Sequence, residues 1–127
     1  MPARRILIVD DEDDIREVAQ VSLELLGHYE VLTASCGRDG LDSARTDQPD
    51  AILLDVMMPR IDGIELLKEI RGHPLLSTLP VLVYTNAFVP KLTEEAKLAG
   101  ATDVFAKTQL SPKMLVEILD TKYLKDS

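Results

Sequence analysis

Three acidic residues that follow short apolar runs are the part of this sequence best suited to chemistry. Asp10 and Asp11 come directly after the run RILIV, and Asp55 comes directly after the run AILL. Both runs are predicted to be buried strands, and the carboxyl ends of parallel strands meet at the sheet edge where ligands bind. Carboxylates gathered there repel one another unless protons or a cation neutralise them. We therefore expect a divalent metal ion, and hard oxygen ligands favour Mg²⁺.

The elements that must position these acids alternate between short β-branched runs and longer amphipathic stretches. This alternation predicts an α/β domain in which a parallel sheet carries helices on both faces. The expected strands are 5–10, 29–34, 51–55, 81–85 and 102–107. The expected helices are 13–26, about ten residues around Leu41 and Ala44, a segment led by Asp62 and Gly63, 94–99, and a last helix from Pro112. In the doubly wound order 2-1-3-4-5, the three acids line the crevice between the first and third strands.

Several local features of the helices can also be predicted. The inward stripe of the first helix is expected to contain Ile15, Val18, Ala19, Val21, Ser22, Leu25 and Leu26. Gly27 is expected to end this helix in the left-handed conformation. The acidic residues Glu12, Asp13 and Asp14 are expected on its solvated start, where the helix dipole favours negative charge. Ser111 is predicted to cap the last helix, and Thr93 the helix 94–99.

Two more polar residues are expected at the same edge of the sheet. Thr85 ends the fourth strand and Lys107 ends the fifth, so separate segments bring carboxylates, a hydroxyl and an amine together. This set suits phosphoryl transfer, in which one carboxylate is the nucleophile while the metal, lysine and hydroxyl share the charge of the transferred oxygens. Taken singly, each residue is more often a helix cap or a turn residue. Their convergence at one edge favours the functional interpretation.

The chain resembles the receiver domains of two-component response regulators, in their single-domain, chemotaxis-regulator-like form. The resemblance is carried by the motifs LIVDDE, LLDVMMPRIDG, VYT and AGATDVFAK, which occur in the family's order and close to its spacing. It implies a flavodoxin-like fold, with a five-stranded parallel sheet of order 2-1-3-4-5 and five helices. It also implies that residues 1–127 form one receiver domain without an output domain.

The resemblance assigns a catalytic set and a metal-binding set. Asp55 is implied to accept the phosphoryl group, Thr85 to bind a phosphoryl oxygen, and Lys107 to form an ion pair with it. The implied ligands of Mg²⁺ are Asp10, Asp11, Asp55 and the backbone carbonyl of Met57. Such a domain takes part in its own phosphorylation and dephosphorylation and is not a conventional turnover enzyme.

The resemblance also implies partners. The phosphodonor is expected to be a histidine kinase or a histidine phosphotransfer protein. Phosphorylation adds about −1.5 to −2 charge, which would draw Thr85 and Lys107 toward the new oxygens. The face made by the fourth helix, the fifth strand and the fifth helix is expected to shift and to bind a separate downstream protein. Onward transfer from Asp55 to a histidine is the alternative output.

Three positions depart from the family pattern. Thr108 stands where proline usually follows the lysine, and because a cis bond to a residue other than proline costs about 2.5–4 kcal/mol we expect a trans peptide. Val104 replaces the usual aromatic residue, with Phe105 expected on the opposite face of the sheet. Asn86 replaces a usually small residue. These departures leave open a receiver-like scaffold that works without phosphorylation.

A second rival is a phosphatase of the haloacid dehalogenase type, which also uses an aspartate nucleophile at a strand end with Mg²⁺. It needs a general acid two residues after the nucleophile, and that position holds Met57. The sequence therefore disfavours this enzyme class.

Composition restricts the remaining function classes. The chain has 127 residues, enough for one domain, and a net charge of −8, which argues against direct binding to nucleic acid. A single cysteine, Cys36, excludes an intrachain disulfide. No apolar stretch approaches the length of a membrane span or a secretory signal. We expect a soluble, cytoplasmic protein.

Overall fold

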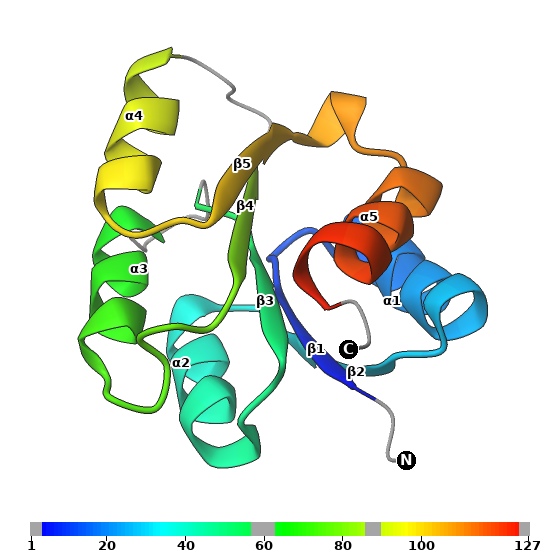
Figure 1. Cartoon of the computed structure of the whole chain (residues 1–127), viewed down its shortest axis with the longest axis horizontal. Coiled ribbons are helices and arrows are strands. Elements are labelled where there is room, and N and C mark those ends of the chain that lie inside the picture. The colour runs from blue at the N-terminus through cyan, green and yellow to red at the C-terminus, as the bar shows by residue number, and fades with distance from the viewer. Residues whose placement is uncertain (1–3, 57–62, 86–89, 125–127) are drawn as a thin grey trace.

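A parallel sheet with helices on both faces forms the centre of the computed structural model, which describes residues 4–56, 63–85 and 90–124 (Figure 1). The strands are β1 (Arg5–Val9), β2 (Glu30–Ala34), β3 (Ala51–Leu54), β4 (Val81–Thr85) and β5 (Asp103–Ala106). All neighbouring strands pair in parallel, in the order β2-β1-β3-β4-β5. The predicted fold class and strand order are confirmed.

The helices divide between the two faces of the sheet. They are α1 (Asp13–Gly27), α2 (Gly37–Asp47), α3 (Gly63–Gly72), α4 (Pro90–Leu98) and α5 (Pro112–Ile118). Figure 1 shows α1 and α5 on one face and α2, α3 and α4 on the other. A 3₁₀ turn, Lys107–Gln109, links β5 to α5, and a π-helical turn, Leu119–Tyr123, follows α5.

Side chains alternate along each strand, so the hydrophobic core has one part on each face of the sheet. Leu54, Val81 and Val83 pack toward α2, α3 and α4, whereas Leu53 and Leu82 pack toward α1 and α5. The central strands β1, β3 and β4 are buried on both faces because helices cover both, which explains why they are mostly apolar instead of alternating with polar residues. Packing on both faces of the sheet holds the carboxyl ends of the strands in fixed positions relative to one another.

The buried stripe of α1 differs from the prediction. Ala19 and Leu23 are buried, but Leu25 is 71% exposed and Leu26 is 56% exposed. The helix carries apolar residues over more than half of its circumference, so periodicity alone did not identify which row packs on the sheet. The row at spacing four, with Ile15 at its start, is the one that meets β1 and α5.

Two predicted helix boundaries are also wrong. The left-handed residue that ends α1 is His28, with φ of 57°, whereas Gly27 is still helical. Gly27 is needed for space, because a Cβ there would lie 2.6 Å from the Tyr29 ring. The helix α4 begins at Pro90, so Thr93 lies inside it and is no cap.

Two other local predictions are confirmed. The hydroxyl oxygen of Ser111 accepts a hydrogen bond from the backbone N–H of Met114 at 3.2 Å, which caps α5 with Pro112 in its first turn. Every peptide bond in the described residues is trans, including the one between Lys107 and Thr108.

Candidate functional site

The three predicted acids converge at the carboxyl edge of the sheet. Val9 pairs with Leu54 across β1 and β3, so Asp10 and Asp55 leave neighbouring strands at the same level. Asp10 is 0% exposed and Asp55 is 2% exposed. Asp10, Asp11 and Asp55 each offer one carboxylate oxygen, and these three oxygens lie within 4.8 Å of one another. The sequence therefore located this cluster correctly.

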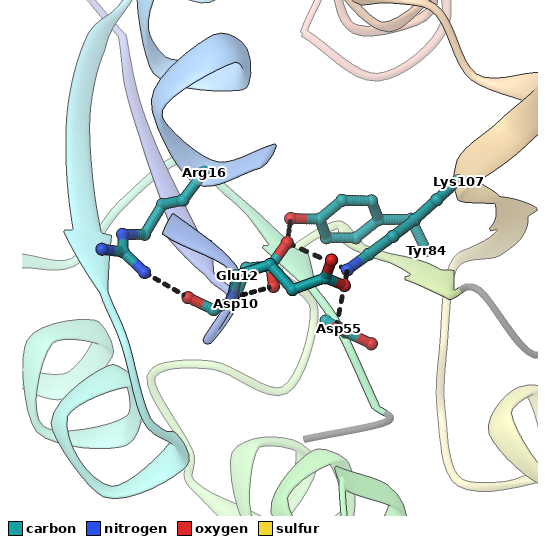
Figure 2. Close-up of polar contacts among 6 residues, drawn as sticks. All are labelled: Asp10, Glu12, Arg16, Asp55, Tyr84 and Lys107. Atoms are coloured by element: carbon teal, nitrogen blue, oxygen red, sulfur yellow. Dashed lines mark hydrogen bonds and ion pairs between the residues drawn. The ribbon is translucent and has the colours of Figure 1, made fainter. Parts of the chain in front are cut away.

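Lys107 provides the positive charge at the centre of the cluster. Its Nζ lies 2.8 Å from Asp55 Oδ2, 2.8 Å from Glu12 Oε1 and 3.1 Å from Asp10 Oδ2, as Figure 2 shows. The side chain is only 4% exposed. Burial alone would lower the pKa of Lys107, but the hydrogen bonds to Asp55 and Glu12 and the nearby negative charges outweigh it and raise the pKa. The amine is therefore held in its charged form.

Glu12 has a different environment from the predicted one. Asp13 and Asp14 are exposed in the first turn of α1, as expected, but Glu12 turns inward to Lys107. Its backbone N–H also donates to Asp10 Oδ1 at 2.9 Å. Nothing in the local sequence indicated this, because the partner lies 95 residues away along the chain.

Tyr84 is a second participant that the sequence reasoning missed. Its hydroxyl donates a hydrogen bond to Asp10 Oδ2, and its ring lies under Lys107, whose Nζ is 4.9 Å from the ring centroid. Burial, followed by the hydrogen bond to Asp10 and the neighbouring carboxylates, raises the pKa of Tyr84. A signal existed, because a tyrosine in an otherwise aliphatic buried strand needs a partner for its hydroxyl.

Arg16 holds the backbone at the end of β1, on the side of Asp10 away from Lys107. Its Nη1 donates to the backbone oxygen of Asp10 at 2.7 Å, and its Nη2 lies 2.5 Å from Asp13 Oδ1. The guanidinium thus ties the turn after β1 to the first turn of α1, as Figure 2 shows for its contact with Asp10. This fixes the backbone that carries the acidic pair.

Thr85 lies at the end of β4 and is 1% exposed. It pairs with Ala106 of β5, the residue that precedes Lys107. Thr85 and Lys107 therefore leave adjacent strands at nearly the same level, as the sequence predicted. Met57 and Asn86 fall outside the described residues, so the predicted backbone ligand remains a prediction.

The residues before Lys107 face opposite sides of the sheet. Val104 is buried in the layer against α3 and α4, and Phe105 packs in the layer against α1 and α5. The expected separation of these two side chains is confirmed.

The donor set fits a hard divalent cation. Lys107 brings one positive charge into contact with three carboxylates, and Asp11 adds a fourth negative charge to the cluster. The excess negative charge is buried at Asp10 and Asp55, where repulsion is costly unless a cation compensates it. Carboxylate oxygens are the ligands that Mg²⁺ prefers.

Comparison with known proteins identifies the family. The sequence matches the response regulator receiver domain over residues 6–120. This chain is a member of that family. Receiver domains belong to two-component signalling systems, use Mg²⁺, and act with histidine kinases or phosphotransfer proteins as signalling domains.

Curated relatives are longer than this chain. It is 47% identical over 119 residues to the response regulator MprA of Mycolicibacterium vanbaalenii, covering 94% of this chain and 48% of that protein. It is 46% identical over 82 residues to the alkaline phosphatase synthesis transcriptional regulatory protein PhoP of Bacillus subtilis, covering 65% of this chain and 33% of that protein. The receiver domain described here thus spans half or less of the length of these relatives.

Solved structures of similar size share the fold. The chemotaxis protein CheY4 of Vibrio cholerae has a TM-score of 0.86 and 34% identity, covering 94% of this chain and 98% of that one. A putative response regulator from Chloroflexus aurantiacus has a TM-score of 0.87 and 35% identity, covering 98% of this chain and 100% of that one. Across the described residues, no helix is both long and apolar enough to cross a bilayer.

Proposed function

We propose that this receiver domain accepts a phosphoryl group on Asp55 and that the modification switches its binding to a separate protein. The observation that carries the proposal is the placement of the Asp55 carboxylate, 2.8 Å from the Lys107 amine and within the cluster formed with Asp10 and Asp11. A nucleophilic carboxylate beside a fixed cation and two further acids is the arrangement that aspartyl phosphorylation requires.

The proposed reaction begins at a phosphohistidine of a histidine kinase or histidine phosphotransfer protein. A carboxylate oxygen of Asp55 attacks phosphorus, the N–P bond breaks, and the imidazole leaves with the electron pair of that bond and takes up a proton. Lys107 stabilises the charge on the phosphoryl oxygens, and the hydroxyl of Thr85 donates a hydrogen bond to one of them. Mg²⁺, held by Asp10, Asp11, Asp55 and the backbone carbonyl of Met57, supplies further charge neutralisation when bound.

The proposed switch follows from where these groups sit in the chain. Lys107 begins the turn between β5 and α5, and Thr85 is the last residue of β4 before the segment that leads to α4. New negative charge on Asp55 would pull both side chains and so shift the face formed by α4, β5 and α5 between two arrangements. That face is the proposed docking surface for the downstream partner.

The test is phosphorylation of the purified chain by acetyl phosphate in Mg²⁺, followed by intact-protein mass spectrometry. We expect a single phosphoryl adduct that Asp55→Asn and removal of Mg²⁺ by EDTA both abolish. Asp42→Asn is the matched control, because Asp42 is exposed and pairs with Arg45 on the surface of α2. It should be modified like the wild type.

An absence of adduct in the wild type would contradict the proposal and favour the phosphorylation-independent scaffold. An adduct that persists in Asp55→Asn would place the acceptor elsewhere. Release of inorganic phosphate in repeated turnovers from a phosphate ester would instead support the phosphatase alternative.

A further inference from the structure

The Tyr84 hydroxyl is one of the groups that hold the carboxylate of Asp10. Asp10 Oδ2 accepts from this hydroxyl, and Asp10 Oδ1 accepts from the backbone N–H of Glu12 at 2.9 Å. Tyr84 is 4% exposed and Asp10 is 0% exposed, so bulk water has little access to the hydrogen bond between them. Because each oxygen is fixed by a donor from a different segment, the carboxylate plane cannot rotate freely.

The same tyrosine also holds Lys107. The ammonium lies over the face of the Tyr84 ring, 4.9 Å from its centroid, and only 3.1 Å from Asp10 Oδ2 (Figure 2). The hydroxyl and the amine therefore share one oxygen of Asp10. If the hydroxyl were lost, Lys107 would be the stronger remaining partner of that oxygen and would draw the carboxylate toward itself.

Strand alternation explains how Tyr84 reaches this position. Tyr84 packs in the layer that faces α1 and α5, together with Leu53 and Ile8. Asp10 and Asp55 lie two residues beyond Ile8 and Leu53, so they extend the same face of the sheet. The ring packs in this layer, with its hydroxyl on Asp10 and its face under the Lys107 ammonium.

We propose that Tyr84 is a positioning residue that sets the Mg²⁺ affinity of the acid cluster by orienting Asp10 and by limiting its pairing with Lys107. The inference rests on the metal site of the proposed function. Hydrogen-bond partners behind metal ligands commonly change metal affinity about 10–100-fold. The hydroxyl acts on Mg²⁺ affinity by orienting Asp10, and the ring acts on it by keeping the ammonium of Lys107 in place.

The test is a Mg²⁺ titration of the full chain by isothermal titration calorimetry. Tyr84→Phe keeps the ring and removes only the hydroxyl, and we expect the Kd for Mg²⁺ to rise about tenfold. The rate of phosphorylation by acetyl phosphate should need correspondingly more Mg²⁺ to reach half of its maximum. A merely structural role would not move this Mg²⁺ dependence.

Tyr29→Phe is the matched control. The Tyr29 hydroxyl also donates to a carboxylate, Asp120, and its ring is also buried in the layer against α1 and α5, but Asp120 is no part of the acid cluster. This variant loses the same kind of hydrogen bond and should bind Mg²⁺ like the wild type.

The outcomes separate this inference from the function on which it rests. An unchanged or lower Kd in Tyr84→Phe, with Mg²⁺ bound by the wild type, overturns the role of Tyr84 alone. A wild-type chain that binds no Mg²⁺ overturns the metal site and this inference with it. Should Tyr84→Phe fail to fold, NMR of the wild type decides, because the Tyr84 hydroxyl proton must shift on Mg²⁺ addition while that of Tyr29 stays in place.

Discussion

Lys107 is the residue whose charge makes the acid cluster tolerable without a metal ion. Its amine contacts Asp10 and Asp55, both buried, as well as Glu12. Removing one partner from a buried ion pair leaves uncompensated charge and costs about 3–5 kcal/mol. We expect Lys107→Met to lower the free energy of unfolding by about 3 kcal/mol in EDTA, measured by urea denaturation at neutral pH. Added Mg²⁺ should restore part of the loss, because it supplies the missing positive charge.

Lys122→Met is the control for this prediction. Lys122 also pairs with a carboxylate, Asp103, at 3.2 Å, but its side chain is 61% exposed. Exposed pairs contribute little, so the denaturation midpoint should stay close to that of the wild type. Equal losses in the two variants, or a loss in Lys107→Met that Mg²⁺ deepens, would contradict the electrostatic account.

Arg71 lies at the end of α3 and joins several elements at the amino edge of the sheet, away from the acid cluster. Its Nε donates to the backbone oxygen of Gly100 at 2.8 Å, and its Nη1 donates to that of Leu79 at 2.5 Å. Its Nη2 donates to the hydroxyl of Thr102 at 3.1 Å, and the same hydroxyl accepts from the N–H of Val81 at the start of β4. One side chain therefore connects α3, the loop before β4 and the turn before β5.

This connection predicts that Arg71→Met destabilises the domain by about 2–3 kcal/mol, because several carbonyls lose a charged donor at once. The measurement is the free energy of unfolding in urea. Arg45→Met is the matched control, since the guanidinium of Arg45 pairs on the surface with Asp42 of its own helix. It should change stability by less than about 0.5 kcal/mol. A comparable loss in both variants would show that Arg71 does not join these elements energetically.

At the scale of the element, the start of α3 was predictable from the sequence only in part. The sequence placed Gly63 at the start of this helix, but the reason for a glycine there appears in the fold. A Cβ at this position would lie 2.3 Å from the Cα of Val56, the residue after Asp55. The helix start and the end of the acceptor strand thus approach closer than any side chain allows.

For the whole molecule, the proposed switch predicts that phosphorylation of Asp55 changes the structure mainly toward α4, β5 and α5. In amide NMR spectra, phosphorylation by acetyl phosphate in Mg²⁺ should shift resonances in α4, β5 and α5, because Thr85 and Lys107 lead into them. The strand β2 provides the control, since it lies at the far edge of the sheet from β5. Shifts confined to the neighbours of Asp55, or equally large in β2, would contradict the proposed docking face.

The surface charge of the whole chain bears on its partners. A net charge of −8 opposes attraction to a phosphate backbone, so direct binding to nucleic acid is not proposed. The absence of an output domain stays a prediction, because the matched relatives are about twice the length of this chain. The cytoplasmic location also stays a prediction.

Much of the site could be predicted from the sequence, because its residues stand directly after the apolar runs that form the strands. Apolar runs predict the strands, the strand ends of a parallel sheet share one edge, and the doubly wound order makes the first and third strands neighbours, so together these rules place Asp10, Asp11 and Asp55 side by side. Thr85 and Lys107 followed by the same reasoning. The fold class was predictable from the alternation of buried strands with covering helices, and the strand order from the resemblance to receiver domains.

What the tertiary structure alone decided concerns contacts between distant segments. Glu12 meets Lys107 and Tyr84 meets Asp10 across 95 and 74 residues of sequence, respectively. The buried row of α1 depended likewise on where α5 and the sheet lie. Periodicity specifies that a helix has an apolar side, and strand alternation specifies a face, but neither fixes the distance or angle between two such surfaces. Tertiary packing determines that distance and angle, and it therefore also determines which charged and polar groups come into contact.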